Sequence, residues 1–280
     1  MVRIITDSAA DFEPQELEKL DIACIPLTVS FGDQDYQENV NLTKPQFFQL
    51  LADFHGAPKT AQASPQILKD LFREAQKAGD EAVYITLSSA LSGTYQTARM
   101  IQEDVDCPEC HVLDSRNATG DQRLLVEYAV RLRDEGKTAA QIVEAVEAIR
   151  DKVVLYACID TLEYLYRGGR ISQTVYKLGT MAQVKPIIRV SEEGKIEVPS
   201  KAMGMRKGVD FLAKRLEQQK PSGEHPVYVM YTPDPGNARM LQQKLETAGI
   251  TVEDTHFISV GAAIGSHIGH NGCGIVYVAE

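Results

Sequence analysis

The sequence of 280 residues predicts an α/β protein with a parallel-sheet N-terminal domain over residues 1–159 and a second, mixed α/β domain over residues 160–280. Two observations support this fold class. Up to residue 159, short runs rich in β-branched residues alternate with longer segments of helical periodicity, a pattern typical of parallel sheets. Beyond residue 160, a β-hairpin pattern appears among such units, and a hairpin requires antiparallel strands.

The first domain contains alternating strands and helices. Strands are predicted over residues 2–6, 22–31, 82–87, 111–114 and 153–159. Helices are predicted over residues 13–20, 45–54, 65–78, 95–103, 122–135 and 138–150. The last helix opens with Thr138 and Gln141, which have the spacing of a capping box.

The second domain begins with the hairpin pattern. Residues 186–191 and 195–199 flank Glu192-Glu193-Gly194, and this pattern predicts a hairpin of two antiparallel strands. The remaining pattern predicts a helix over 205–218, a strand over 227–232, a helix over 236–248 and closing strands near 252–260 and 274–279. There is no internal repeat.

The charge of the chain is uneven. The formal net charge of -10 argues against nonspecific nucleic-acid binding. Residues 167–215, however, hold eleven Lys or Arg against four Asp or Glu, so this stretch carries +7 and the rest -17. The basic stretch is either a solvated surface of the hairpin and helix or a docking face for an acidic or phosphorylated partner.

The sequence contains no signal for export or membrane insertion. The first five residues enter a strand at once, and no apolar run approaches the roughly 20 residues that a spanning helix needs. Five cysteines in a chain of this length fit a reducing compartment, so a cytoplasmic location is expected. Cys107 and Cys110 have zinc-like spacing, but no second pair completes a metal site, so neither metal nor redox use is predicted.

The most informative segment joins the strand over 82–87 to the helix that follows. Residues 88–94, here called the serine loop, contain three serines, Gly93 and Thr94 directly before the predicted helix start at Tyr95. Backbone N–H groups at a helix start, the helix dipole and added hydroxyls favour an anion. The alternative is that Ser92 or Thr94 only caps the helix.

Three further loops have a composition suited to binding. Thr6-Asp7-Ser8 follows the first strand at its carboxyl end, where α/β sheets place ligands. The segment Lys59-Thr60-Ala61-Gln62-Ala63-Ser64 puts hydroxyls and an amide before Pro65, which suits the first turn of a helix. Residues 261–274 contain five glycines and are predicted to be a loop that allows close backbone approach.

Several catalytic and cofactor motifs are absent from the sequence. There is no P-loop, no G-x-G-x-x-G after the first strand and no G-x-S-x-G nucleophile elbow. His267, His270 and Cys273 could be drawn as a metal site, but their spacing is loose, and a core or capping histidine is favoured. No metal and no cofactor are therefore predicted, and the loops indicate a site that binds an anion and leaves the reaction to another protein.

Six motifs occur in one order along essentially the whole chain: Thr6-Asp7-Ser8-Ala9-Ala10-Asp11, Thr60-Ala61-Gln62-Ala63-Ser64-Pro65, residues 87–95, Asp160-Thr161-Leu162-Glu163-Tyr164-Leu165 with Gly168-Gly169-Arg170-Ile171, Lys185-Pro186-Ile187, and Gly265-Ser266-His267. In this order they resemble the motifs of the DegV family, and within it those of the fatty-acid-binding subunits of bacterial fatty acid kinase.

This resemblance implies a DegV-like, two-domain protein that holds a long-chain fatty acid in a tunnel, with the carboxylate near the domain junction. It implies that Thr60, Ser92 and His267 hold the carboxylate, and that Arg170 and Arg206 meet the kinase subunit and its phosphates. The loop residues that would support the carboxylate site are Gln62, Ser64, Gly93 and Thr94. The implied partners are a long-chain fatty acid, the catalytic subunit of a fatty acid kinase, which binds ATP and magnesium, and transiently a membrane.

Three departures from the family pattern accompany this resemblance. Ala61 and Ala63 replace a serine and a proline of the T-S-Q-P-S loop, and Gly269-His270-Asn271 replaces Gly-Pro-Gly, so the type of ligand stays open. Residues 116–121 are more polar than the serine-rich family version.

Alternatives to the kinase subunit also stay open. One is a free-standing phosphoryl-transfer or hydrolytic enzyme that uses the serine loop with His267 as base. Another is a sensor that binds the same ligand without any kinase. For Arg170, the alternative to docking is an internal salt bridge that pins the glycine turn before it.

Overall fold

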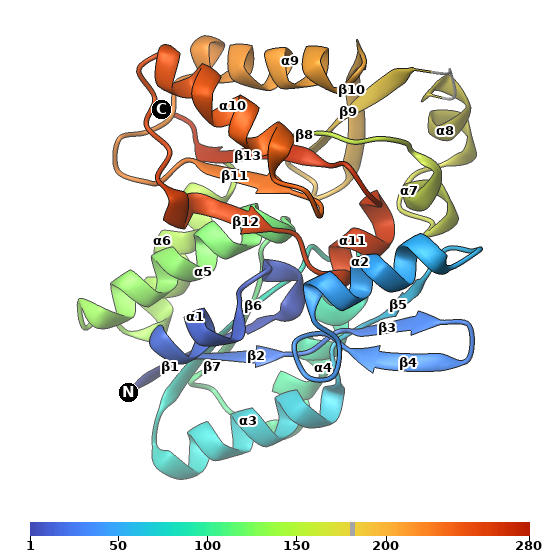
Figure 1. Cartoon of the computed structure of the whole chain (residues 1–280). Coiled ribbons are helices and arrows are strands. Elements are labelled where there is room, and N and C mark those ends of the chain that lie inside the picture. The colour runs from blue at the N-terminus through green and yellow to red at the C-terminus, as the bar shows by residue number, and fades with distance from the viewer. Residues whose placement is uncertain (180–182) are drawn as a thin grey trace.

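The computed structural model of this chain describes residues 1–179 and 183–280 and contains two main β-sheets with helices around them (Figure 1). A four-stranded sheet from the N-terminal half lies in the lower part of Figure 1, and a six-stranded sheet lies above it. Helix α5 (Thr119–Asp134) contacts strands of both sheets. The predicted fold class, a parallel N-terminal sheet followed by a mixed α/β part, is confirmed.

The four-stranded sheet is entirely parallel and has the strand order β2-β1-β6-β7. Its strands, three of which match predicted strands within one residue at either end, are β1 (Val2–Asp7), β2 (Ile22–Ile25), β6 (Glu81–Thr86) and β7 (Cys110–Asp114). Successive side chains of a strand point to opposite faces. Ile4 therefore packs with the core under α5 and α6, and Ile5 packs with the core under α3 and α4.

The helices of this half begin and end close to the predicted positions. Helix α3 has the predicted bounds, and Thr138 caps α6 in the predicted capping box with Gln141. The bounds are η1 (Ser8–Ala10), α1 (Pro14–Lys19), α2 (Lys44–Asp53), α3 (Pro65–Ala78), α4 (Thr94–Val105) and α6 (Ala139–Arg150).

The predicted strand over 22–31 is wrong as a single element. Pro26 has no backbone N–H and separates β2 from β3 (Thr28–Phe31), which joins a different sheet. This three-stranded antiparallel sheet has the order β4-β3-β5 and includes two strands that were not predicted, β4 (Gln34–Gln37) and β5 (Lys59–Ala61). Thr60 therefore lies on β5, an edge strand of this sheet, and not in a loop.

The six-stranded sheet is mixed and has the order β10-β9-β8-β13-β11-β12. All of its neighbours are antiparallel except β11 and β12. Strand β8 pairs with β9 and β13, although the boundary at residue 159 assigns it to the first domain, so the two sheets divide before β8 and not after it. The strands are β8 (Val153–Cys158), β9 (Val184–Val190), β10 (Ile196–Met203), β11 (Tyr228–Tyr231), β12 (Phe257–Ser259) and β13 (Cys273–Val278).

Strands β9 and β10 form the predicted hairpin, and α9 (Met205–Gln218) has the predicted bounds. Helices α9 and α10 (Gly236–Thr247) cover one face of the six-stranded sheet through Leu212, Leu216 and Leu241. The other face packs on α5 and α7 (Glu163–Arg167), with α8 (Gln173–Gly179) beside α7. The predicted strand near 252–260 is shorter than expected, because η2 (Asp254–His256) occupies its first half.

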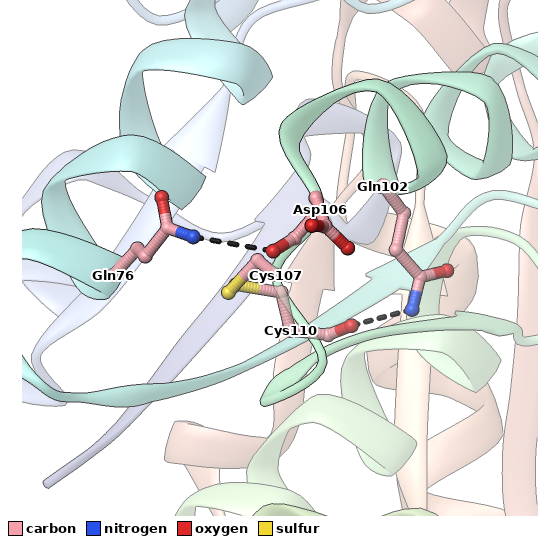
Figure 2. Close-up of a disulfide and its surroundings, with 5 residues drawn as sticks. All are labelled: Gln76, Gln102, Asp106, Cys107 and Cys110. Atoms are coloured by element: carbon pink, nitrogen blue, oxygen red, sulfur yellow. Dashed lines mark hydrogen bonds between the residues drawn. A yellow bond between two sulfur atoms is a disulfide. The ribbon is translucent and has the colours of Figure 1, made fainter.

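Cys107 and Cys110 form a disulfide between the end of α4 and the start of β7 (Figure 2). Gln76 donates a hydrogen bond to the carbonyl of Asp106 at 3.2 Å, and Gln102 donates one to the carbonyl of Cys110. The sequence predicts reduced cysteines, and for this pair the structure differs. Cys24, Cys158 and Cys273 are free thiols.

Two findings on the described residues bear on function classes. No helix within residues 1–179 and 183–280 has both the length and the apolar composition that a membrane-spanning helix needs. In the same part of the chain, no group of three or more His, Cys, Asp and Glu side chains is arranged to hold a metal ion.

Candidate functional site

The site lies where the strand order of the parallel sheet reverses. The chain leaves β1 toward β2 on one side and later returns to β6 on the other, and α/β sheets bind ligands at the carboxyl ends of such strands. Asp7 ends β1, and its carboxylate accepts hydrogen bonds from the N–H groups of Leu87 at 2.8 Å and Ala9 at 3.2 Å. Burial raises the pKa of Asp7 to about 6. Asp7 therefore fixes the start of the serine loop rather than contacting a ligand.

The serine loop is held from both sides. Ser88 donates a hydrogen bond to the carbonyl of Gly194 in the β9–β10 turn at 2.9 Å. The Ser92 hydroxyl accepts a hydrogen bond from the Thr94 N–H at 3.2 Å and lies 2.9 Å from the Thr94 hydroxyl, which in turn accepts one from the Ala63 N–H at 3.3 Å. Helix α4 begins at Thr94, one residue before the predicted start. Ser92 thus stabilises the helix start, and it also lines the cavity described next.

A cavity lies between the six-stranded sheet and the loops that follow the strands of the parallel sheet. Apolar side chains make up most of its wall, among them Leu27, Leu87, Leu155, Ile188, Met230 and Ile264. Polar side chains of the wall include Thr60, Gln62, Ser92, Arg170 and His267, all of them residues that the sequence singled out. The cavity can therefore enclose a long apolar group and offer hydrogen bonds to a polar end.

His267 and Thr60 meet in this wall, 207 residues apart in sequence. His267 lies on α11 (Ala262–Ile268), and its Nε2 is 3.0 Å from the Thr60 hydroxyl. The predicted loop over 261–274 is thus wrong for its first half, which is a helix. Burial, and then the nearby Arg170 guanidinium, lower the pKa of His267 to about 3, so its imidazole is neutral at physiological pH.

Two glycines at the site lie close to side chains of the cavity wall. A Cβ atom on Gly168 would lie 2.2 Å from His267 Nδ1, and one on Gly93 would lie 2.6 Å from the Gln62 side-chain oxygen. Gly168 belongs to a sequence motif, but its contact with His267 was not predicted. The glycine pair before Arg170 is visible in the sequence. The sequence alone does not show that His267 packs against it.

The other residues that the sequence singled out lie partly inside and partly outside the cavity wall. Gln62 lines the cavity. Ser64 is the N-cap residue of α3 without a side-chain capping bond, and it is outside the cavity wall. His270 packs its ring on Phe48 with 5.6 Å between centroids, and Cys273 is buried on β13.

Arg170 and Arg206 do not share a site. Arg170 is half-buried in the cavity wall and donates hydrogen bonds to the carbonyls of Leu91 at 3.0 Å and Gly168 at 2.5 Å. The alternative role of Arg170 was an internal salt bridge that pins the glycine turn. The structure has a hydrogen bond to the Gly168 carbonyl in that place and not a salt bridge. Arg206 is exposed in the first turn of α9 and is outside the cavity wall.

The fold and cavity define a class of α/β protein with two main sheets and a largely apolar pocket whose wall includes hydroxyls, an imidazole and a guanidinium. The model of the DegV family, described as a family of uncharacterised proteins, matches residues 1–280. A DegV domain-containing protein of Caldanaerobacter subterraneus is 31% identical over 282 residues, which cover 99% of this chain and 98% of that protein. This chain therefore belongs to the DegV family.

Solved structures of the same fold are known. The chain matches a fatty-acid-binding DegV family protein from Thermus thermophilus with a TM-score of 0.89, 26% identity and coverage of 100% of this chain and 99% of that one. It matches DegV, a fatty acid binding protein from Bacillus subtilis, with a TM-score of 0.86, 26% identity and the same coverage. A stearic acid-binding protein from Eubacterium ventriosum gives a TM-score of 0.88 at 25% identity, covering 100% of this chain and 98% of that one.

Proposed function

We propose that this protein binds one long-chain fatty acid in the largely apolar cavity, with the carboxylate among Thr60, Ser92 and His267. The observation that carries the proposal is the cavity itself, whose apolar wall includes the hydrogen-bonding side chains of these three residues. The fatty-acid binding stated for the relatives from Thermus thermophilus and Bacillus subtilis supports it.

The energetics divide the roles of tail and head group. A sixteen-carbon chain buries about fourteen methylenes at roughly 0.8 kcal/mol each, or about 11 kcal/mol before the costs of binding. Each hydrogen bond to a carboxylate adds about 1.5–3 kcal/mol. The tail therefore supplies most of the affinity, and the head-group residues decide which end of the cavity the carboxylate occupies.

The charge of the carboxylate is balanced by Arg170 in this proposal. His267 is neutral because its pKa is lowered to about 3, so it acts as a hydrogen-bond donor and not as a cation. Burial also lowers the pKa of Arg170, but a guanidinium stays charged at every physiological pH. A buried carboxylate beside the guanidinium would repay part of the cost of burying it.

The finer part of the proposal is that the protein presents the carboxylate to a separate fatty acid kinase, which forms the acyl phosphate in the cytoplasm. The absence of a nucleotide motif supports a separate site for ATP. Arg170 beside the carboxylate would meet the transferred phosphate, and exposed Arg206 would contact the kinase surface. A transient membrane contact would supply or receive the fatty acid.

A free-standing enzyme with His267 as general base is less well supported. A general base works best with a pKa near the operating pH, and the pKa of His267 is far below it. The binding role needs only a neutral donor, which His267 provides.

The proposal is tested on protein purified from bacterial cells. The protein is denatured, and the released small molecules are identified and quantified by mass spectrometry. We expect a fatty acid in near-stoichiometric amount. Release of a nucleotide or a sugar phosphate instead, or of nothing after incubation with palmitate, would contradict the lipid assignment.

A further inference from the structure

Helix α11, which carries His267, begins in a buried polar environment built by the first 44 residues of the chain. The Asp11 carboxylate accepts a hydrogen bond from the Gly261 N–H at 2.9 Å. The Glu38 carboxylate accepts hydrogen bonds from the N–H groups of Ala262 and Ala263, the latter at 3.3 Å. We call Asp11, Glu38 and Lys44 the α11 clamp.

Lys44 completes the clamp from the start of α2. Its ammonium group donates hydrogen bonds to the carbonyls of Asp11 and Ser259, each at 2.8 Å, and forms an ion pair with Glu13 at 2.7 Å. Asp11 and Glu38 are each 1% exposed and Lys44 is 6% exposed. Burying charged groups is costly unless they are paired and hydrogen-bonded, so a buried ion pair is weak evidence for a gain in stability. A role in fixing the local geometry is the better explanation here.

The clamp supplies what α11 lacks on its own. The first N–H groups of a helix have no partner inside the helix, and α11 has no side-chain cap of its own. Carboxylates at this end also interact favourably with the helix dipole. The contact is close enough that a Cβ atom on Gly261 would lie 2.1 Å from a Glu38 carboxylate oxygen and 2.9 Å from one of Asp11.

The position of α11 determines the wall of the cavity. The helix contributes Ala263, Ile264, His267 and Ile268 to that wall. Its middle approaches α2 so closely that a Cβ atom on Gly265 would lie 2.6 Å from the Phe47 ring. Asp11 and Glu38 lie 250 and 224 residues before the N–H groups that they bind. They therefore join the beginning of the chain to the helix that carries His267.

We propose that Asp11 and Glu38, supported by Lys44, are positioning residues for the carboxylate site: they fix α11 so that His267 meets Thr60. The fatty acid as the ligand of this site rests on the proposed function. The effect of the clamp on the position of His267 does not depend on it. No residue of the clamp lines the cavity, so none would touch the fatty acid.

The test compares five single variants of the whole protein by two measurements. Glu38→Ala and Asp11→Ala remove the carboxylates, Glu38→Asp keeps the charge but shortens its reach, and Glu38→Gln keeps an acceptor oxygen. Asp33→Ala, an exposed carboxylate in the same part of the chain, is the control. The measurements are the imidazole nitrogen signals of His267 by NMR and the dissociation constant for palmitate.

We expect a single His267 tautomer in the wild type and in Asp33→Ala. In the alanine variants and in Glu38→Asp, the His267 signals should move toward tautomer averaging, and palmitate affinity should fall about tenfold. Glu38→Gln should restore much of the wild-type spectrum. If an alanine variant does not fold, Glu38→Asp decides the question.

Lower thermal stability in these variants, with an unchanged His267 spectrum and unchanged palmitate affinity, would overturn the proposal and leave the clamp a purely structural feature. Failure of the wild type to bind palmitate would instead contradict the proposed function. In that case the His267 spectra would still test the clamp.

Discussion

At the scale of single residues, Ser92 has two contacts that can be separated by experiment. Its hydroxyl accepts the Thr94 N–H at 3.2 Å and also lines the cavity. Loss of the hydroxyl from the head-group site should cost about 1–3 kcal/mol of binding, the range for one partner of a charged hydrogen bond. Loss of the contact at the helix start should cost stability of about 1 kcal/mol.

The first prediction is that Ser92→Ala weakens palmitate binding by about 1–3 kcal/mol in a calorimetric titration. Thr94→Val is the matched control, because the Thr94 hydroxyl binds Ser92 and the Ala63 N–H but is outside the cavity wall. This control should lower the melting temperature and weaken palmitate binding less than Ser92→Ala does, because the Thr94 hydroxyl contacts the Ser92 hydroxyl but lies outside the cavity wall. A fall in melting temperature of Ser92→Ala with full ligand retention would mean that Ser92 only caps α4.

The second prediction concerns Arg170, whose charge contributes to the low pKa of His267. Arg170→Ala should raise that pKa from about 3 toward its usual range, measured by an NMR titration of the imidazole. Bound fatty acid should stay near stoichiometric at saturating palmitate, because the tail supplies most of the affinity even without the guanidinium that balances the carboxylate. Acyl-phosphate formation with a kinase subunit should fall. The kinase effect should shrink as salt screens the wild-type contact.

Arg206→Ala is the comparison for Arg170, since Arg206 is exposed and outside the cavity wall. It should lower acyl-phosphate formation and leave the His267 titration unchanged. Equal loss of fatty acid and of kinase turnover in Arg170→Ala would show that Arg170 maintains the pocket and is not a docking residue.

At the scale of elements, long helices with clear periodicity were predictable and short elements shaped by contacts were not. Helices α3 and α9 have the predicted bounds because apolar positions recur over four turns. Helix α11 was missed because Gly265 sits in its middle, where glycine is unfavourable unless close packing, here on Phe47, requires it. Strands β2 and β3 were predicted as one strand because the break at Pro26 was passed over and because their pairing partners, β1 and β5, belong to different sheets.

The third prediction uses the two glycines that end α7. Gly168→Ala should push the His267 ring away, because the new Cβ would lie 2.2 Å from Nδ1. Overpacking of this kind costs roughly 1–3 kcal/mol, and palmitate affinity should fall with it. The check is a binding titration together with thermal unfolding.

Gly169→Ala is the matched control for Gly168→Ala. Gly169 has a φ of +73° and open space around its Cβ position, so alanine there is strained by roughly 1–2 kcal/mol without touching His267. It should lower stability and spare affinity. Equal affinities of the two variants would contradict the role given to the Gly168–His267 contact.

At the scale of the whole molecule, the fold class could be predicted, but the interior charges could not. The alternation of elements predicted a parallel sheet followed by a mixed one. Ordered motifs selected Thr60, Ser92 and His267, which line one cavity, and their contact with a carboxylate stays a prediction. Asp11 belongs to the first of the six motifs, but no role was predicted for Asp11, Glu38 or Lys44. Their burial depends on contacts across more than 200 residues, which local sequence patterns do not encode.

The fourth prediction is a pH dependence of stability caused by Glu38. Burial, followed by the nearby Asp11 carboxylate, raises the pKa of Glu38 from 4.5 to about 7, while Lys44 opposes this rise. Between these two pH values the folded state binds more protons than the unfolded state, so this group makes stability fall as pH rises. Below pH 4.5 and above pH 7 its contribution is constant.

The measurement is chemical denaturation of the wild type and of Glu38→Gln at several pH values. The difference isolates Glu38 from His267, whose lowered pKa acts in the opposite direction below pH 6.5. The wild type should lose stability relative to the variant between pH 4.5 and 7 and should then level off. Parallel pH profiles of the two proteins would contradict a raised pKa at this position.

In the proposed complex, the carboxylate of a fatty acid lies among Thr60, Ser92 and His267. A crystal structure of the protein with bound palmitate tests it most directly, because electron density shows both the presence and the direction of the chain. We expect carboxylate oxygens within about 3.5 Å of the Thr60 and Ser92 hydroxyls and of His267 Nε2, with the tail along the apolar wall. A carboxylate at the opposite end of the cavity, or palmitate bound elsewhere, would contradict it.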